Sequence, residues 1–504
     1  MHDAFVRLFR ARFHEDPASA VPIAADGSQR KMVRVTGASG TTAIGVTGPD
    51  PEENRAFLSY SASLRAIGLP VPQVYGADEA SGRYLVEDLG DVTLFRALST
   101  AREAAGGTFP PALVPVYRAV LETLPRFQVE GGRAVDFSVA YPRAAFDRQS
   151  MQWDVDYFKY HFLKLAKVPF NEDRLQRDVD VLVARLLDTD TRHFLYRDFQ
   201  SRNVMLRDGS PWFIDYQGGR RGALAYDPAS LLYDAKAALP PALREELLEH
   251  YLDALAEHLP LDRDRFRREF RGYVLIRILQ AMGAYGYRGF FERKTHFLQS
   301  VPLALRNLEA LLAEGLVGGE VELPELRAVL ERVCARDDLR RVPEAAESGL
   351  CVRVGSFSYR FGYPEDETGH GGGFVFDCRG LANPGLDPSL APLDGRHPAV
   401  VRALERDAAV PTFVARAWGL VEGQIASYLA RGYTALDVHF GCTGGRHRSV
   451  YVAERVAALV KERFPAVRVA LRHREASHWA EPLPLDAADV RAAAGRPLGD
   501  AWTR

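Results

Sequence analysis

The stretch FLYRDFQSRNVMLRDGSPWFIDYQ, residues 194–217, constrains the fold of this 504-residue chain more than any other segment. It predicts a loop, a strand, a tight turn at Asp208-Gly209 and a second strand. The chain around it, from about residue 94 to residue 336, has the apolar periodicity of helices. The sequence therefore predicts a helical lobe with one embedded hairpin.

A strand-rich lobe is expected ahead of these helices. The runs MVRVTG (32–37) and TAIGVTG (42–48) predict paired strands, and RYLVEDLG (83–90) predicts another. Between them, EENRAFLSYSASLRAIG predicts a helix that ends at Gly68. We therefore expect an α+β bilobal domain, with a sheet lobe over residues 1–90 and a helical lobe over residues 91–338.

A second domain is expected after a polar, proline-containing linker at residues 339–349. Residues 350–504 alternate strand-like and helix-like segments, as in FVFDCRGL, AWGLVEGQIASYLARG and ALDVHFGC. This alternation is typical of an α/β domain. A chain of this length suits two or three domains rather than one hydrophobic core.

The composition indicates an ordinary soluble protein. The net charge of −2 gives no global attraction to nucleic acid or to a membrane surface. The four cysteines have no CxxC pairing, which argues against a zinc site or a disulfide framework. The start, MHDAFVRLFRARF, predicts an amphipathic helix rather than a signal peptide, and no apolar run is long enough to span a membrane. A cytoplasmic location is the expectation.

Residues 196–215 carry the groups that phosphoryl transfer from a nucleotide requires. Such a reaction needs a base for the attacking hydroxyl and hard oxygen ligands for Mg²⁺. Asp198 is the candidate catalytic base, Asn203 follows in the same loop, and Asp215 ends the strand WFID. Asn203 and Asp215 are the candidate Mg²⁺ ligands. The alternative, that these are ordinary loop and turn carboxylates, is weakened by the intervening hairpin and the order of the lobes.

The motifs RDFQSRN (197–203) and IDYQ (214–217), with AYDPASLLYD (225–234), resemble the aminoglycoside phosphotransferase/choline kinase superfamily over about 320 residues. They are most similar to its branch of sugar 1-kinases, which phosphorylate N-acetylmuramate or N-acetylglucosamine. The resemblance implies a protein-kinase-like fold and the cofactors ATP and Mg²⁺. Gln217 and Asp227 become candidate substrate contacts, although Asp227 also suits a helix N-cap. Arg220 and Arg221 lie close enough in sequence to reach a substrate.

The same resemblance implies a nucleotide site in the first lobe. The turn Asp26-Gly27-Ser28-Gln29-Arg30 resembles the family's nucleotide-covering turn, and Glu87-Asp88-Leu89 the hinge that would meet adenine. The predicted nucleotide-binding residues are therefore Gly27, Ser28, Arg30, Glu87 and Leu89. Many relatives have a lysine where this chain has Ala43-Ile44-Gly45-Val46. Arg30 or Lys31 is the candidate replacement for that ammonium group.

The strongest signal beyond residue 350 is LDVHFGCTGGRHRSVYVAERVAALV, residues 436–460. A buried strand leads into a glycine-rich loop and then into a helix, and unpaired N–H groups at a helix start bind anions. The predicted anion-site residues are Cys442, Thr443, Gly444, Gly445, Arg446, His447, Arg448 and Ser449. The loop also fits the cysteine-phosphatase pattern Cys-x-x-Gly-x-x-Arg-Ser, but Gly441 stands where those enzymes usually have histidine.

The segments FSYRFGYP (357–364), FVFDCRGLANP (374–384) and GCTGGRHRSVYVAE (441–454) resemble the C-terminal domain of the RNase adapter RapZ. That family senses glucosamine 6-phosphate and binds small RNA. The resemblance implies sugar-phosphate contacts from Thr443, Gly444 and Arg448. Gly385 stands where the family often has a histidine or an aromatic residue. Residues 441–474 carry eight Lys and Arg against two Glu, a basic density that RNA binding would use.

Both domains point to amino sugars, so the expected function is an ATP-dependent amino-sugar kinase of cell-wall recycling with a sugar-phosphate-sensing domain. Its expected partners are a small amino sugar and a sugar phosphate, with RNA as a further candidate. One rival is a kinase for an aminoglycoside or another alcohol. The other is an RNA-binding adapter with a degenerate kinase lobe, which the missing strand lysine would favour.

Overall fold

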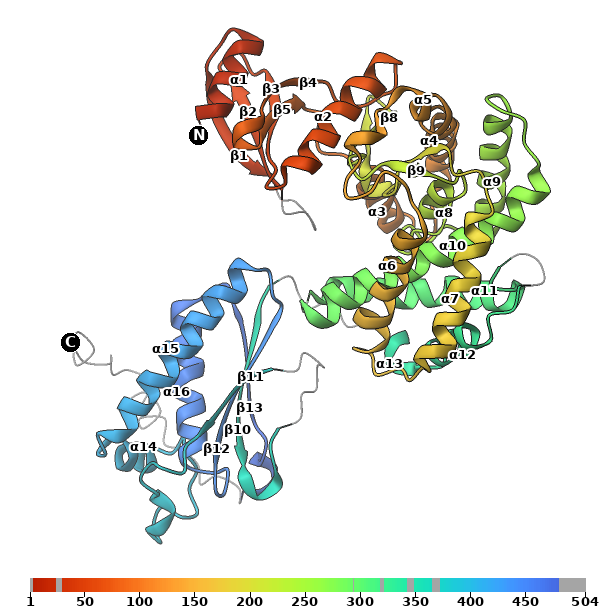
Figure 1. The fold of residues 1–504 in the computed structure, drawn as a ribbon. Helices are drawn as coiled ribbons and strands as arrows, with labels where there is room; N and C mark the ends of the chain where they lie inside the picture. Colours follow the sequence, from red (N-terminus) through yellow and green to blue (C-terminus); the bar gives the residue numbers. More distant parts are fainter. Residues whose placement is uncertain are drawn as a thin grey trace. The chain divides into compact units, whose positions relative to one another are not determined.

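The computed structural model describes residues 3–23, 30–292, 294–317, 321–341, 349–364 and 372–479. The chain divides into two units, residues 1–287 with 300–342, and residues 288–299 with 343–504 (Figure 1). The predicted linker begins inside the short helix α13 (Asp337–Arg340), and its residues 342–348 lie outside the described part. Residues 288–299, which the sequence assigned to the first domain, group with the second unit.

The first lobe of unit 1 contains a five-stranded antiparallel sheet in the order β1-β2-β3-β5-β4 (Figure 1). Its strands are β1 (Pro17–Ile23), β2 (Lys31–Gly37), β3 (Thr42–Thr47), β4 (Val74–Asp78) and β5 (Arg83–Glu87). The predicted pairing of MVRVTG with TAIGVTG is confirmed, because β2 and β3 pair in antiparallel register. The strands β1 and β4 were not predicted.

Two helices accompany this sheet. Helix α1 (Asp3–Phe13) is the predicted amphipathic helix, and it buries Phe5 and Phe9 against Val35 and Leu85 of the sheet. Helix α2 (Pro51–Ala66) starts after Asp50, whose side chain accepts hydrogen bonds from the Glu52 and Glu53 amides. That cap satisfies two of the N–H groups that a helix start leaves unpaired.

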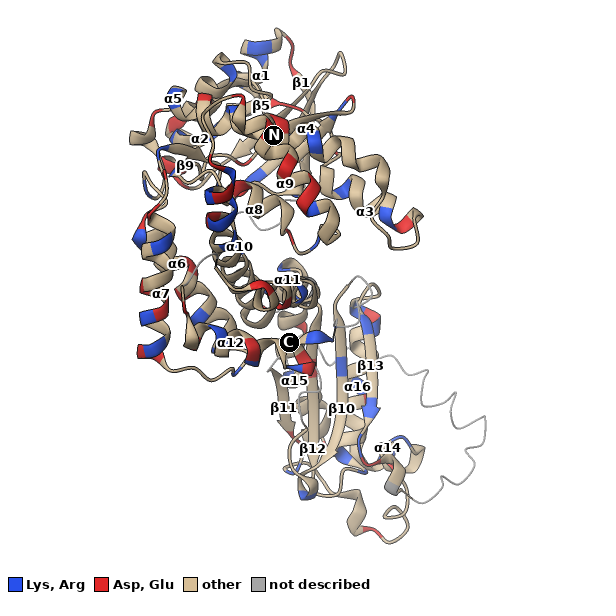
Figure 2. Ribbon diagram, turned by 90° about the vertical axis from the view of Figure 1, so that its right-hand side faces the viewer, with Lys and Arg blue, Asp and Glu red and all other residues tan. Residues whose placement is uncertain are grey.

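The second lobe of unit 1 is helical, as predicted. Its main helices are α3 (Leu94–Ala104), α4 (Val114–Pro125), α6 (Arg148–Phe158), α7 (Glu172–Leu187), α8 (Tyr226–Leu232), α9 (Pro241–Ala256), α10 (Arg263–Gly286), α11 (Val301–Glu314) and α12 (Pro324–Cys334). Helix α10 packs against α6, α8 and α11 and forms the centre of the lobe (Figure 1). Basic and acidic residues are interspersed along its helices, such as α7 (Figure 2).

The embedded hairpin is also confirmed. Strands β7 (Val204–Arg207) and β8 (Ser210–Phe213) pair in antiparallel register around Asp208 and Gly209. Both turn residues have positive φ, 52° and 77°, which suits a two-residue hairpin turn. A second short pair, β6 (His193–Leu195) with β9 (Arg220–Gly222), holds the two ends of residues 196–219 together.

Unit 2 contains a four-stranded parallel sheet in the order β11-β12-β10-β13. Its elements are β10 (Cys351–Ser358), β11 (Gly373–Asp377), α14 (Pro398–Glu405), α15 (Ala409–Ala430), β12 (Ala435–Cys442), α16 (Arg448–Arg463) and β13 (Arg468–His473). Helix α16 packs on β10, β12 and β13, and α15 lies beside α16 (Figure 1). The predicted α/β class is confirmed. Because all four strands are parallel, their carboxyl ends share one edge of the sheet.

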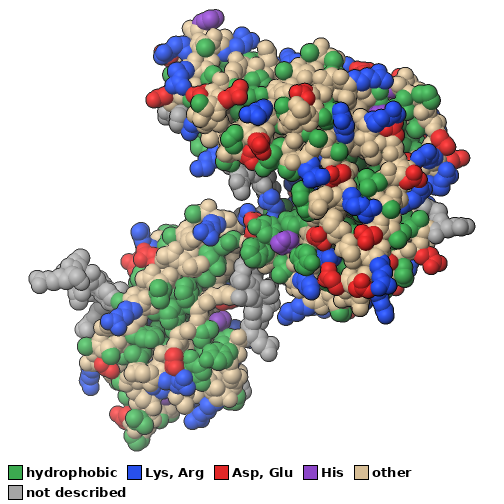
Figure 3. Space-filling model, in the orientation of Figure 1, with side chains coloured by type: hydrophobic (Ala, Val, Ile, Leu, Met, Phe, Trp, Pro, Cys, Tyr) green, Lys and Arg blue, Asp and Glu red, His purple; other side chains and the backbone are tan. Residues whose placement is uncertain are grey.

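Helix α15 buries one side and exposes apolar residues on the other. Val414, Val421 and Ile425 belong to the core of unit 2, whereas Leu420 and Leu429 are exposed. Figure 3 shows apolar side chains on this face of unit 2. Within the described residues, no helix combines the length and the hydropathy that crossing a membrane would require.

Candidate functional site

The candidate base Asp198 lies in the loop between β6 and β7 of unit 1. Its side chain is half-buried, and among the described residues it makes no hydrogen bond or ion pair. A Cβ placed on Gly218 would lie 3.9 Å from Asp198 Oδ2, so the chain after Asp215 returns alongside this carboxylate. An unpartnered carboxylate with a glycine beside it can approach a substrate hydroxyl.

Arg197 anchors the loop next to Asp198. Its guanidinium forms a bidentate ion pair with Asp154 at 2.6 and 2.8 Å and donates to the Tyr226 hydroxyl at 2.6 Å. Arg197 has a φ of 82°, a conformation that costs a non-glycine residue energy and must be held by its surroundings. The sequence analysis missed Asp154, because nothing local links α6 to a loop 43 residues away.

Asp227 supports the same loop through hydrogen bonds to its backbone. Its side chain is fully buried, and its carboxylate accepts from the amides of Tyr196 (2.9 Å) and Arg197 (3.1 Å) and from Gln128 Nε2 (3.3 Å). Burial raises the pKa of Asp227 to about 7, while these three donors oppose that rise. The predicted N-cap role is wrong, since the N-cap of α8 is Ala225. The substrate contact stays a prediction, and the hydrogen bonds of Asp227 show that it orders the backbone of the loop.

The two candidate metal ligands lie together. Asn203 Nδ2 donates to the Asp198 carbonyl at 2.8 Å and to Asp215 Oδ2 at 3.2 Å. Because the amide nitrogen of Asn203 donates to these two oxygens, its amide oxygen is the side-chain atom that can bind a cation. The described residues hold no cluster of three or more His, Cys, Asp or Glu side chains able to bind a metal. One carboxylate and one amide fit Mg²⁺, which keeps water and nucleotide phosphates as its other ligands.

Gln217 joins this pair to the first lobe. Its Nε2 donates to Asp215 Oδ1 at 2.7 Å and to Glu53 Oε1 at 3.3 Å, and its Oε1 is buried without a partner. The predicted substrate contact is therefore a residue that orients Asp215, with only its amide oxygen left for a ligand. The connection to Glu53 was not predicted, because Glu53 and Gln217 are 164 residues apart in sequence.

Arg30, rather than Lys31, pairs with a glutamate of helix α2 and is the better candidate to replace the missing strand lysine. The Arg30 guanidinium lies 3.1 Å from Glu53 Oε1 and over the ring of Phe57, whereas Lys31 is exposed. Kinases of this architecture pair a strand lysine with a glutamate on the adjacent helix. The Arg30–Glu53 pair has the same chemistry, with the cation supplied from the start of β2. The turn residues Gly27 and Ser28 lie outside the described residues.

The predicted hinge residues follow the end of β5. Glu87 is tied down by its neighbours, since it accepts from Arg207 at 2.6 Å and from the Gln73 amide at 3.1 Å. Leu89 is buried. The backbone of this segment is therefore the part suited to pair with a base edge, and the hinge role stays a prediction.

Arg220 and Arg221 have different environments. Arg220 is buried and donates to the Gly218 carbonyl at 3.0 Å, and burial together with the charge of Arg197 lowers its pKa to about 10. Arg221 is exposed and lies over the ring of Phe137. Arg220 therefore shapes the floor of the site next to Asp198, and Arg221 faces away from the core.

The glycine-rich loop of unit 2 lies at the carboxyl edge of its sheet. Cys442 and Ser449 are buried, with Cys442 Sγ 3.1 Å from Ser449 Oγ, while Thr443 and Gly444 are exposed. Helix α16 starts at Arg448 without a side-chain cap, because His447 forms no capping hydrogen bond. The exposed loop and the uncapped helix start fit an anion. A buried, hydrogen-bonded thiol does not suit a phosphatase nucleophile.

Three basic side chains of this loop contact backbone carbonyls of unit 2. Arg446 Nη1 donates to the Ala391 carbonyl, His447 Nε2 contacts the Leu390 carbonyl, and Arg448 Nη1 donates to the carbonyls of Arg379 and Leu381. These contacts fix the connection between β11 and α14, because backbone carbonyls there need donors. The expectation that Arg448 faces the anion is thus modified, since its guanidinium already bridges two carbonyls.

Glu475 was missed by the sequence analysis. It is buried beneath the loop, its Oε1 accepts from Arg474 Nε at 2.7 Å, and its Oε2 has no partner. A Cβ on Gly445 would lie 2.7 Å from that Oε2. This carboxylate therefore lies directly under the turn at Gly445.

Comparisons with known proteins find a different family in each of the two units. Residues 19–263 match the phosphotransferase enzyme family, and residues 350–477 match the RapZ C-terminal domain. A curated N-acetylmuramate/N-acetylglucosamine kinase of Pseudomonas aeruginosa is 28% identical over 62% of this chain and 88% of its own length. A nucleotide-binding protein of Thioalkalivibrio sulfidiphilus is 33% identical over 50% of this chain and 82% of its own length. A choline kinase structure from Cryptosporidium parvum has a TM-score of 0.42 at 12% identity, covering 65% of this chain and 99% of that one.

Four further curated relatives, all named nucleotide-binding proteins, are matched over only part of their length. The chain spans between 40% and 58% of them. Both family resemblances noted from the sequence are confirmed by the matches to the two segments. Through residues 19–263 the chain belongs to the phosphotransferase enzyme family, and through residues 350–477 it carries a RapZ C-terminal domain.

Proposed function

We propose that unit 1 is an ATP- and Mg²⁺-dependent kinase that phosphorylates a hydroxyl of an amino sugar. The observation that carries this proposal is the convergence of an unpartnered Asp198 with Asn203 and Asp215 on a loop held by Arg197 and Asp227. The relative from Pseudomonas aeruginosa, named N-acetylmuramate/N-acetylglucosamine kinase, supports an amino sugar as the acceptor. The anomeric hydroxyl as the reacting group is what the sequence resemblance to the sugar 1-kinases implies.

The side chains divide the reaction between them. The oxygen of the acceptor hydroxyl bonds to the γ-phosphorus of ATP while the bond between that phosphorus and the β-phosphate oxygen breaks. Asp198 accepts the proton that the hydroxyl loses. Asn203 and Asp215 would hold Mg²⁺, which would neutralise charge on the phosphates. Gln217 and Glu53 orient Asp215, and Arg30 adds a positive charge on the nucleotide side.

The kinase proposal is tested by measuring ADP release from ATP and Mg²⁺ with a panel of acceptors. The panel contains N-acetylmuramate, N-acetylglucosamine, glucosamine and an aminoglycoside. We expect sugar-dependent turnover that Asp198→Ala lowers at least about 100-fold, since general-base catalysis contributes that much. Asp208→Asn is the matched control, because it removes a carboxylate from the nearby hairpin turn. Turnover no higher than that of Asp198→Ala with every acceptor would rule out the kinase.

We propose further that unit 2 binds a sugar phosphate at Thr443, Gly444 and the uncapped start of α16. Gly444 has open space on the side of a missing Cβ. Gly444→Asp therefore adds a negative charge to the loop without a clash and should abolish binding of glucosamine 6-phosphate in calorimetry. Gly444→Asn, of the same size, should retain it. Equal binding by both variants would place the ligand elsewhere.

RNA is the second candidate ligand of unit 2, and β13 favours it. Arg468 and Arg472 lie on the exposed side of this edge strand, and basic residues are visible along it in Figure 2. Binding to phosphate backbones by such residues would weaken steeply as salt is raised. A gel-shift titration with RNA at two salt concentrations measures this salt dependence and so separates RNA binding from sugar-phosphate binding.

A further inference from the structure

Arg34 of β2 bonds to both ends of the segment that connects the two lobes of unit 1. Its Nε donates to Asp88 Oδ2 at 2.7 Å, and its Nη2 donates to Asp88 Oδ1 at 3.1 Å. The same guanidinium donates to the Asp91 carboxylate at 2.8 and 3.1 Å and to the Gly90 carbonyl at 3.4 Å. One guanidinium thus bridges two carboxylates at opposite ends of residues 88–91.

Residues 88–91 form the span between the lobes. They follow the last residue of β5, and directly after them the Val92 carbonyl accepts from the Leu206 amide of the second lobe at 2.8 Å. Gly90 has a φ of 86°, and no atom lies within 4 Å of its Cβ position, so packing leaves its backbone free to rotate. The five hydrogen bonds from Arg34 therefore restrain a span that its own packing does not fix.

Arg34 shares one face of the first lobe's sheet with Ile44 and Val86. Arg34 is opposite Ile44, and Ile44 is opposite Val86, and directly opposed residues point to the same face. Helix α1 packs on the other face. Tyr84, two residues before Val86, stacks on Phe57 of α2 at 5.1 Å between ring centroids. The face with Arg34 is therefore the one that also carries α2.

We infer that Arg34 is a positioning residue for the nucleotide. By bridging Asp88 and Asp91 it holds the predicted hinge, residues 87–89, in the backbone conformation that meets the base. The inference rests on the proposed kinase function and adds a restraint that sets its nucleotide affinity. A segment that is ordered before binding does not lose that freedom on binding, so the bridge strengthens affinity. Without the guanidinium the two carboxylates repel each other, and the span loosens.

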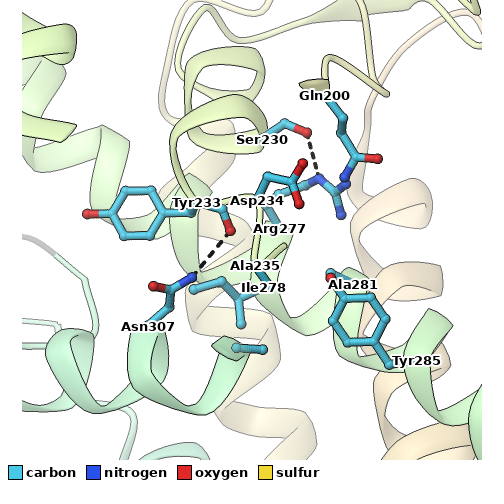
Figure 4. A pocket seen from close by; sticks show the side chains of 11 residues that line it. Gln200, Ser230, Tyr233, Asp234, Ala235, Arg277, Ile278, Ala281, Tyr285 and Asn307 are labelled. Carbon is cyan, nitrogen blue, oxygen red and sulfur yellow. Dashed lines mark hydrogen bonds between the residues drawn. The ribbon is translucent and has the colours of Figure 1, made fainter. Parts of the chain in front are cut away.

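The loop that carries Asp198 is held by other contacts. Ser201 Oγ of this loop donates to Asp234 Oδ2 at 3.0 Å. Figure 4 shows Gln200 of the same loop and Arg277 of α10 on the wall of a cavity of about 10 Å³, which has room for about one water. Because these contacts do not involve the hinge, loss of its bridge should raise KM for ATP and leave kcat nearly unchanged.

The test measures the Kd of ADP with Mg²⁺ by calorimetry, together with KM for ATP and kcat. We expect Arg34→Gln to raise the Kd and KM about tenfold and to change kcat by less than about twofold. Arg34→Lys should recover part of the affinity, because an ammonium group keeps the charge but lacks the planar fork. Arg7→Gln is the matched control, because Arg7 forms an ion pair with Asp78 in the same lobe, and it should leave the Kd unchanged.

Asp91→Asn keeps the inference testable if Arg34→Gln does not fold, since the Asp91 side chain is 60% exposed. It should raise the Kd of ADP about threefold, the size expected for one partly exposed ion pair. Arg34→Gln should then add less to Asp91→Asn than to the wild type, because both changes act through one bridge. Hydrogen exchange of residues 89–92 without nucleotide should be faster in both variants.

The outcomes separate this inference from the kinase proposal. ADP binding that depends on Arg34, without turnover of any acceptor, would support the inference and reject the reaction. Turnover with a KM for ATP that Arg34→Gln leaves within twofold would support the kinase and overturn the inference. Effects of Arg34→Gln and Asp91→Asn that simply multiply, or a fall in kcat as large as the rise in KM, would also overturn it. A wild type that does not bind ADP would overturn both.

Discussion

The Asp227 carboxylate accepts the backbone amide of Arg197 at 3.1 Å, and this bond ties α8 to the loop that presents Asp198. Arg197 has positive φ and would not keep that conformation unaided. The Asp154 ion pair holds the Arg197 side chain, and Asp227 holds its backbone. The candidate base Asp198 thus follows a residue that two buried carboxylates, Asp154 and Asp227, hold in place.

Replacing Asp227 by Asn should disable the loop while leaving its volume unchanged. The amide has one acceptor atom for the three donors of Tyr196, Arg197 and Gln128, so at least one buried donor loses its partner. We expect a loss of about 1–3 kcal/mol in the free energy of unfolding and a fall in kcat of at least about tenfold. Urea unfolding and steady-state kinetics measure the two effects. A variant with kcat within threefold of the wild type would contradict this role.

Arg30→Ala should weaken ATP use much more than Lys31→Ala. Arg30 pairs with Glu53, which contacts Gln217 and through it Asp215, whereas the side chain of Lys31 is exposed. We expect KM for ATP to rise about tenfold or more for Arg30→Ala and to stay within twofold for Lys31→Ala. Arg30→Lys should recover part of the loss because it keeps the charge. Equal effects of the two alanine variants would assign no special role to Arg30.

Local signals explain which parts of the fold could be predicted. The Asp208-Gly209 turn and the apolar runs of β2 and β3 specify their own structure, and both predictions are confirmed. Strand β1 was missed because PASAVPI contains two prolines and its burial does not alternate. Strand β9 has three residues, and only its pairing with β6 makes it a strand. Edge and short strands depend on their partners, which a sequence pattern does not contain.

In the candidate sites too, the residues of a local motif could be predicted, whereas roles that depend on distant partners could not. Asp198, Asn203 and Asp215 follow from a motif within 18 residues, and the structure brings Asn203 and Asp215 together as expected. Asp227 was assigned to a substrate because its burial depends on Gln128 and the loop it supports. Arg448 was assigned to an anion because the carbonyls that it binds come from residues 379–381, about 70 residues earlier. Distant partners decide these roles.

His447 should make the stability of unit 2 depend on pH. Burial lowers the pKa of His447 below 6.5, so just below that pH the unfolded chain binds the proton more readily than the folded one. The free energy of unfolding should therefore fall as the pH drops through this range. Hydrogen exchange of α16 at pH 7.5 and pH 5.5 measures the change, and His447→Gln should reduce it. An unchanged pH dependence in His447→Gln would assign the effect to other groups.

Gly445 should tolerate no side chain, while its neighbour Gly444 should. A Cβ on Gly445 would lie 2.7 Å from Glu475 Oε2 and 2.9 Å from the Ser358 amide, and its φ is 65°. Gly444 has no atom within 4 Å of its Cβ position. We expect Gly445→Ala to lower the free energy of unfolding of unit 2 by at least about 2 kcal/mol, and Gly444→Ala to change it by less than about 0.5 kcal/mol. Urea unfolding followed by hydrogen exchange of β12 and α16 measures both. Since one of the two clashes is with a buried carboxylate, Gly445→Ala combined with Glu475→Ala should regain part of the loss. A double variant no more stable than Gly445→Ala would show that backbone strain and the Ser358 amide, rather than Glu475, require glycine here.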